Sequence, residues 1–108
     1  MMEENLVAFI LAAGFSSRMS AFKPLLPLGD TFVLGYAVTL FRKAGVKDIR
    51  VVTGYRAFKL KPVLRELGVR GIQNNHFREG MFSSVQAAVQ TLDDTVDAFF
   101  VLPVDIAL

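Results

Sequence analysis

The sequence predicts an α/β protein, with a three-layer α/β/α, Rossmann-like domain built on a mostly parallel sheet. Four short apolar segments alternate with three segments whose apolar residues recur at the helical period. The first segment, residues 6–12, is apolar without a break, which is typical of a strand buried on both faces of a parallel sheet. Strands that alternate with helices pair in parallel through right-handed crossovers, so helices are expected on both faces.

The first expected strand leads into a long loop, residues 14–30, because small polar residues and two prolines interrupt any periodicity. A helix follows at residues 33–44, where apolar residues return at the helical period. Asp30 or Thr31 is expected to cap its start, and Gly45 to end it.

The second half of the chain repeats the alternation. Pro62 predicts that the middle helix either starts late or is bent in its first turn, and Gly68 is expected to stop it. The remaining elements are expected as strands at 48–53, 69–73 and 98–102 and as helices at 60–67 and 81–92. The last strand is expected to be buried, and four phenylalanines on strand or helix faces are expected in the core: Phe9, Phe41, Phe99 and Phe100.

Length and composition limit the class of protein. A chain of 108 residues is expected to form one domain, and 53% hydrophobic residues exclude a disordered tail. The longest apolar run, residues 6–13, is far shorter than the roughly 20 residues of a membrane span. A formal net charge of +2 gives no reason to expect a nucleic-acid partner. The absence of cysteine excludes a disulfide framework and fits the cytoplasm.

Ligands of open parallel sheets bind outside the carboxyl ends of the strands, where the strand order reverses. This rule points to the loops at 14–23, 54–56 and 74–84 and to Asp105. By residue type alone, the first of these loops fits either a phosphate-binding loop or a solvated turn. It contains neither GxxxxGK[ST] nor GxGxxG, which disfavours a P-loop ATPase and a nicotinamide-dependent oxidoreductase.

Three ordered motifs carry a resemblance to a known family. Residues 11–19 (LAAGFSSRM) and 23–26 (KPLL) resemble the LAAGxSxRM…KxLLP signature of nucleotidyltransferases with the nucleotide-diphospho-sugar transferase fold. Residues 79–85 (EGMFSSV) and 102–105 (LPVD) resemble two further elements of that superfamily. The chain is most similar to the molybdenum cofactor cytidylyltransferase and guanylyltransferase branch, although Ser20 and Ala107 stand where that family usually has Gly and Pro.

The resemblance implies roles for individual residues. The backbone of residues 11–14 would face the base and sugar of a nucleoside triphosphate, and Asp105 would ligate Mg²⁺. Arg18 and Lys23 would stabilise the charge of the reacting phosphates, which is the catalytic role that nucleotidyl transfer requires of protein. The implied nucleotide-binding residues of this first loop are Leu11, Ala12, Ala13, Gly14, Ser16, Ser17, Arg18 and Lys23.

A second group of candidates lies near the start of the third helix. Gly80 belongs to the motif that opens this helix, and Ser83 and Ser84 would either cap the helix or contact ribose or base. Asn75 would either bond the nucleotide or satisfy a turn. His76, the single histidine, is expected at the surface.

The expected reaction is transfer of a nucleoside monophosphate from an NTP, preferably CTP, to a small phosphorylated acceptor such as molybdopterin, with release of pyrophosphate. A sugar-1-phosphate acceptor is the near alternative, and a non-catalytic nucleotide-binding or assembly fragment is the other. Members of the family are longer than 108 residues, so residues 1–108 are expected to be a single, incomplete nucleotidyltransferase domain, truncated after about four strands. The edge of such a sheet favours self-association.

Overall fold

The structure is a computed structural model that describes residues 4–14 and 22–104. Short 3₁₀ turns span Lys23–Leu25 and Phe77–Glu79. The helices and strands in chain order are β1 (Leu6–Ala12), β2 (Pro27–Leu28), β3 (Thr31–Phe32), α1 (Val33–Lys43), β4 (Asp48–Thr53), α2 (Ala57–Leu67), β5 (Arg70–Gln73), α3 (Met81–Val89) and β6 (Ala98–Pro103).

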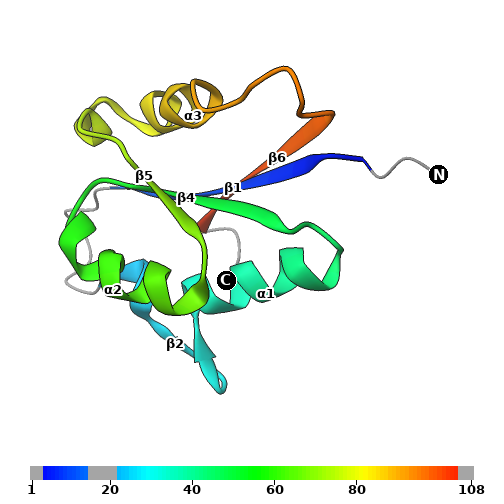
Figure 1. Cartoon of the computed structure of the whole chain (residues 1–108). Coiled ribbons are helices and arrows are strands. Elements are labelled where there is room, and N and C mark those ends of the chain that lie inside the picture. The colour runs from blue at the N-terminus through cyan, green and yellow to red at the C-terminus, as the bar shows by residue number, and fades with distance from the viewer. Residues whose placement is uncertain (1–3, 15–21, 105–108) are drawn as a thin grey trace.

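Four strands form one parallel sheet in the order β5–β4–β1–β6. Helices α1 and α2 cover one face of this sheet, and α3 covers the other (Figure 1). The expected three-layer α/β/α architecture is therefore confirmed. Strand β1 lies inside the sheet and buries six of its seven residues, which is why its sequence is apolar without alternation.

The hydrophobic core has two halves, one on each face of the sheet. Ala8 and Ile10 of β1 point toward α1 and α2, whereas Val7 and Phe9 point toward α3. All four side chains are fully buried. The alternation of side chains along one strand thus supplies both layers.

The strand order reverses at β1. The chain passes from β1 to β4 and β5 on one side and then crosses to β6 on the other side of β1. In open α/β sheets, ligands bind outside the carboxyl ends of the strands at such a reversal. The ends of β1 and β6, which lead to residues 15 and 104, flank that position.

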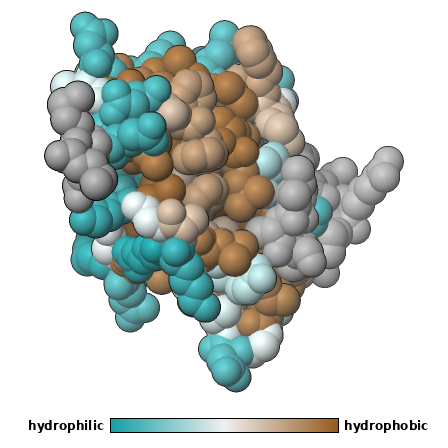
Figure 2. Space-filling model, turned by 90° about the vertical axis from the view of Figure 1, so that its right-hand side faces the viewer, coloured by the Kyte–Doolittle hydropathy of each residue, from teal (hydrophilic) through white to brown (hydrophobic). Residues whose placement is uncertain are grey.

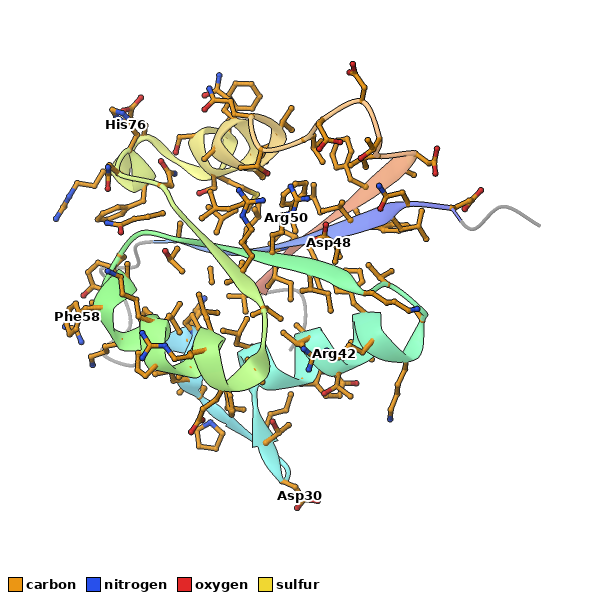
Figure 3. All side chains as sticks on the ribbon, in the orientation of Figure 1. Asp30, Arg42, Asp48, Arg50, Phe58 and His76 are labelled. Atoms are coloured by element: carbon orange, nitrogen blue, oxygen red, sulfur yellow. The ribbon has the colours of Figure 1, made fainter. Side chains whose placement is uncertain are left out.

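A buried arginine fastens α3 to the sheet. Arg50 of β4 is 7% exposed, and its guanidinium donates to both carboxylate oxygens of Asp48 at 3.0 and 2.9 Å. The same guanidinium donates to the carbonyl and hydroxyl oxygens of Thr91, just beyond α3, and lies 5.8 Å from the ring centre of Phe9. Figure 3 shows Arg50 and Asp48 between the sheet and α3. The hydrogen bond to Asp48 raises the pKa of Arg50 above its ordinary value, so this cation is permanent.

The start of α1 differs from the expectation. Asp30 and Thr31 do not cap this helix, because Phe32 is its N-cap and makes no side-chain hydrogen bond. The two residues belong instead to a small hairpin of β2 and β3, whose turn contains Gly29 at φ +59°. Gly45 follows the helix at φ +91°, as expected of a left-handed terminator.

The start of α2 also differs. It begins at Ala57 and runs through Pro62, so the expectation of a late start is wrong, and it ends at Gly68 as expected. Pro62 lies inside this helix and has no backbone N–H, so the carbonyl of Phe58, four residues earlier, receives no helical hydrogen bond from it.

Strand β6 is an exposed edge, and its expected burial is wrong. Phe99, Phe100 and Val101 are 43%, 45% and 37% exposed. The reason is that β6 pairs with β1 on one side, and within residues 4–14 and 22–104 no strand pairs with its other side. Figure 2 shows a broad hydrophobic area in the middle of one face of the molecule. Among the described residues, no helix is long and apolar enough to cross a membrane.

Candidate nucleotide site

The carboxyl ends of β1, β4 and β5 are tied together by backbone hydrogen bonds. The amide of Tyr55 donates to the carbonyl of Ala13 at 3.3 Å, and the amide of Asn74 donates to the carbonyl of Thr53 at 2.7 Å. The loops after these three strands therefore lie side by side, as the strand order requires.

The end of β1 offers its backbone to a ligand. Leu11, Ala12 and Ala13 are buried as whole residues, at 6%, 2% and 1% exposure, so a bound nucleotide would meet them only over a small area. Gly14 is exposed, and no atom of the described residues lies within 4 Å of the place where a Cβ would stand. An exposed backbone with no side chain in front of it is what close approach of a ring or a phosphate requires.

The described chain resumes at Phe22, and Lys23 follows it. This lysine opens the 3₁₀ turn, in which the amide of Leu26 donates to the carbonyl of Lys23 at 3.1 Å. Pro24 is buried and anchors the turn, and Lys23 itself is half-buried. Ser16, Ser17, Arg18 and Asp105, the other residues expected to bind phosphate or metal, lie outside the described residues.

A buried asparagine that the sequence reasoning missed organises the loop between β5 and α3. Asn74 is 4% exposed, and its amide nitrogen donates to the hydroxyls of Ser83 and Ser84 at 2.9 and 3.0 Å. Its carbonyl oxygen accepts from the amide of His76 at 2.9 Å. Asn74 therefore joins the end of β5, the following turn and the first turn of α3. The Asn74-Asn75 pair after a predicted strand was the available signal, but it did not say which asparagine turns inward.

Of the four candidates near the start of α3, Gly80 and Asn75 are exposed, whereas Ser83 is half-buried and Ser84 is buried. Gly80 is the N-cap of α3 at φ +103° and is exposed, and no atom of the part of the chain that the structure describes lies within 4 Å of its Cβ position. Asn75 is exposed and accepts from Gln73 at 3.1 Å. The hydroxyl of Ser83 donates to the carbonyl of Gly80 at 2.6 Å, and Ser84 is 4% exposed. Neither serine is the N-cap, and both are partners of Asn74.

A polar cleft of about 210 Å³ lies along one side of α3. It is lined mainly by amide and hydroxyl groups together with a close polar contact, in which His76 Nδ1 lies 2.8 Å from Glu79 Oε2. Both members of this pair are mostly exposed, as expected for His76. The polar lining residues are Asn74, His76, Glu79, Ser83, Gln86 and Gln90.

The described residues do not form a metal centre on their own. Within the part of the chain that the structure covers, no group of three or more His, Cys, Asp or Glu side chains could hold a metal ion. Mg²⁺ usually takes one or two carboxylates and completes its shell with phosphate oxygens and water. Such a site needs fewer protein ligands than a preformed metal centre does.

The parallel sheet and the open backbone after β1 define a nucleotidyltransferase fold of the nucleotide-diphospho-sugar transferase kind. Residues 8–108 match the MobA-like NTP transferase domain, so the chain belongs to that family. The resemblance that the three motifs carry is thereby confirmed.

Curated and solved relatives agree with this assignment. The chain is 30% identical over 93 residues to the bifunctional protein GlmU of Symbiobacterium thermophilum, covering 84% of this chain and 19% of that protein. It is similar to a nucleotidyl transferase from Methanothermobacter thermautotroptrophicus, with a TM-score of 0.82 and 27% identity over 95% of this chain and 51% of the other. It is also similar to Rv0371c of Mycobacterium tuberculosis H37Rv, with a TM-score of 0.80 and 25% identity over 96% and 53% of the two chains. A manganese complex of Rv0371c matches at 20% identity over 98% and 53% of the two chains, with a TM-score of 0.64. The chain thus spans about half the length of the solved structures named here and a smaller share of GlmU.

Proposed function

We propose that this single domain is the nucleotide-binding part of a nucleotidyltransferase. It transfers a nucleoside monophosphate from an NTP to a phosphorylated acceptor and releases pyrophosphate. The observation that carries the proposal is the open backbone at Gly14, which lies at the carboxyl end of an inner strand and leads to the anchored turn of Lys23.

The proposed roles follow from the chemistry of phosphate transfer, which depends on positioning and on charge stabilisation. The backbone of residues 11–14 faces the base and sugar, and Ser16, Ser17 and Arg18 surround the triphosphate. Lys23 holds oxygens of the α-phosphate, where charge builds during in-line attack by the acceptor. Arg18 and Lys23 are thus the catalytic cations. The contacts to ribose and base come from Asn75, Gly80 and Ser83 at α3. Ser84, which is 4% exposed and accepts from Asn74, holds this loop in place.

We further propose that Asp105 ligates Mg²⁺ together with the phosphates. A hard divalent cation supplies positive charge to the reacting phosphates when it is bound. Support comes from the manganese complex of Rv0371c and from the small number of protein ligands that Mg²⁺ needs.

CTP and molybdopterin are the substrates that we favour, because the Ser83-Ser84 element resembles the cytidylyl branch. A sugar-1-phosphate is the alternative acceptor, and a non-catalytic nucleotide-binding role of the 108-residue chain is the alternative to catalysis. We place the protein in the cytoplasm, without a nucleic-acid partner.

Calorimetric titration with each of the four NTPs in the presence of Mg²⁺ tests the proposal. We expect CTP to bind most tightly, and Arg18→Ala and Lys23→Ala each to weaken binding by about tenfold or more, since each removes a charge-assisted contact to phosphate. Lys47→Ala, an exposed residue before β4 at the opposite end of the sheet, is the matched control and should bind as the parent does. Absence of binding for all four NTPs, or equal binding by the two loop variants and the parent, contradicts the proposal.

We also propose that the chain self-associates through β6, with a second copy pairing against the edge that no described strand occupies. The strand exposes three large apolar side chains and carries no charge between Ala98 and Pro103, so it lacks the charged side chains that discourage edge-to-edge pairing. Sedimentation velocity is expected to show concentration-dependent dimers, and Val101→Lys is expected to return the chain to a monomer. Glu4→Lys, at an exposed position before β1, is the control and should not change the sedimentation of the dimer. A monomer at every concentration would rule out the pairing.

A further inference from the structure

Three aromatic rings run along the carboxyl edge of the sheet. Phe22 precedes the Lys23 turn, Tyr55 follows β4 and Phe77 follows β5. The ring centres of Phe22 and Tyr55 are 6.3 Å apart, and those of Tyr55 and Phe77 are 6.1 Å apart. The rings therefore form one continuous row across three separate loops.

Each ring in the row carries a cation on its face. The ammonium of Lys59 lies 5.9 Å from the centre of Phe22, and the guanidinium of Arg56 lies 5.1 Å from the centre of Tyr55. The guanidinium of Arg78 lies 5.4 Å from the centre of Phe77. All three cationic residues are exposed, whereas the rings beneath them are half-buried. We call Arg56, Lys59 and Arg78 the cation ridge.

The backbone at the middle of the ridge is strained. Arg56 has φ +54° and ψ +39°, and within the described residues it is the one non-glycine residue with a positive φ. A left-handed conformation of such a residue costs free energy and is held by its surroundings. Here it directs the chain from β4 into α2, so that Arg56 and Lys59 reach neighbouring rings.

Charge is distributed unevenly between the two ends of the sheet. The cation ridge and Lys23 lie at the carboxyl end, where Glu79 is an exposed acid of the same loops. At the amino end, exposed acids before β1 and between α3 and β6 stand beside the exposed cations Lys43, Lys47 and Arg70. These acids are Glu4, Asp93, Asp94 and Asp97. A modest net charge of +2 thus conceals a positive carboxyl end, which attracts anions from solution.

We propose that the cation ridge is a binding surface for polyphosphate, which captures the triphosphate of the incoming substrate before it reaches the loop at 14–23. The choice of an NTP as this substrate rests on the proposed function, whereas the affinity for polyphosphate does not. Cations that are already placed on rings lose less side-chain freedom when they bind an anion. Because the cations are exposed, the complex is salt-sensitive, which suits capture followed by transfer.

Tyr55 provides a direct probe of the ridge. The chain has no tryptophan and two tyrosines, so Tyr36→Phe leaves Tyr55, beneath Arg56, as the single fluorophore of this class. The titration uses inorganic tripolyphosphate and an Arg18→Ala/Lys23→Ala background, which removes the proposed phosphate contacts of the first loop. We expect a saturable change of Tyr55 fluorescence, and an affinity about tenfold lower in 300 mM than in 50 mM salt.

Neutralising the ridge with Arg56→Gln, Lys59→Gln and Arg78→Gln is expected to lower the tripolyphosphate affinity by about tenfold or more. Lys43→Gln, Lys47→Gln and Arg70→Gln remove the same charge from the amino end and should leave the affinity within about twofold. Circular dichroism melting checks that the variants fold, and Arg56→Gln alone replaces the triple variant if that one does not. Equal affinity of the ridge variant and its parent, or an equal loss in the control, overturns the proposal.

Stopped-flow binding of the NTP distinguishes this inference from the proposed function. With Arg18 and Lys23 intact, the ridge variant is expected to associate about tenfold more slowly and to dissociate at the parental rate. If no NTP binds while tripolyphosphate binding still depends on the ridge, the proposed function is wrong, but the ridge is still a polyphosphate-binding surface. If NTP binds and its association rate does not depend on the ridge, the ridge does not capture the substrate, and the proposed function is unaffected.

Discussion

Replacing Gly54 with alanine is expected to destabilise the protein and to weaken nucleotide binding together. A Cβ at this position would lie 2.6 Å from the Cβ of Phe77 and 3.0 Å from the Cβ of Ala13. Both atoms are fixed to the backbone, so the loops after β1 and β5 must move apart. We expect the free energy of unfolding to fall by about 2 kcal/mol, as for other overpacked sites. Urea unfolding and NTP titration measure the two effects.

Gly71→Ala is the matched control for this prediction. A Cβ at Gly71, on the neighbouring strand β5, would meet the end of the Leu64 side chain at 2.9 Å. That methyl group can move, so we expect a loss below about 1 kcal/mol and unchanged nucleotide binding. Equal effects of the two substitutions would show that the contact between Gly54 and Phe77 does not hold the loops in place.

Replacing Arg50 with alanine is expected to lower the free energy of unfolding by about 3 kcal/mol, in the range for breaking a buried ion pair. The substitution leaves the carbonyl of Thr91 without its guanidinium donor and removes the cation from the face of Phe9. It also leaves Asp48, whose side chain is 42% exposed, without its partner, which solvent can partly replace. Urea unfolding followed by circular dichroism measures the loss.

Two comparison variants identify its cause. Arg70→Ala removes the exposed arginine that pairs with Arg50 in the register of β4 and β5, and it should change stability by no more than about 0.5 kcal/mol. Arg50→Lys keeps the charge but not the two-pronged geometry, so we expect an intermediate loss. A loss as large for Arg70→Ala as for Arg50→Ala would attribute the effect to net charge and contradict the prediction.

The sequence predicts the parallel sheet because β1 is apolar at every position, which is typical of a strand buried on both faces. Gly45 and Gly68 likewise mark the ends of their helices by a conformation that glycine adopts most readily. These features depend on local residue patterns, which a sequence displays directly.

Other features depend on contacts between distant residues and were not predictable in this way. The apolar sequence of β6 is the same whether the strand is central or at an edge, so the exposure of Phe99 and Phe100 required the strand order. The sequence alone indicates that Arg50 is a surface charge on a strand. Its burial depends on hydrogen bonds to Asp48 and to Thr91, and Thr91 lies 41 residues away. At the site, Gly14 and Gly80 were marked by their motifs, whereas Asn74 was not, because its partners lie nine and ten residues away.

The hydrogen bonds of Asn74 also bear on how the protein opens. Its amide donates to β4, and its side chain joins the turn before α3 to the first turn of that helix. Separating any one of these segments breaks bonds that hold the others, so they form one cooperative unit of local unfolding. Amide hydrogens from the end of β5 to the start of α3 should therefore exchange with solvent at a common rate. A nucleotide held at Gly80 would slow exchange across that whole unit, including amides that it never touches.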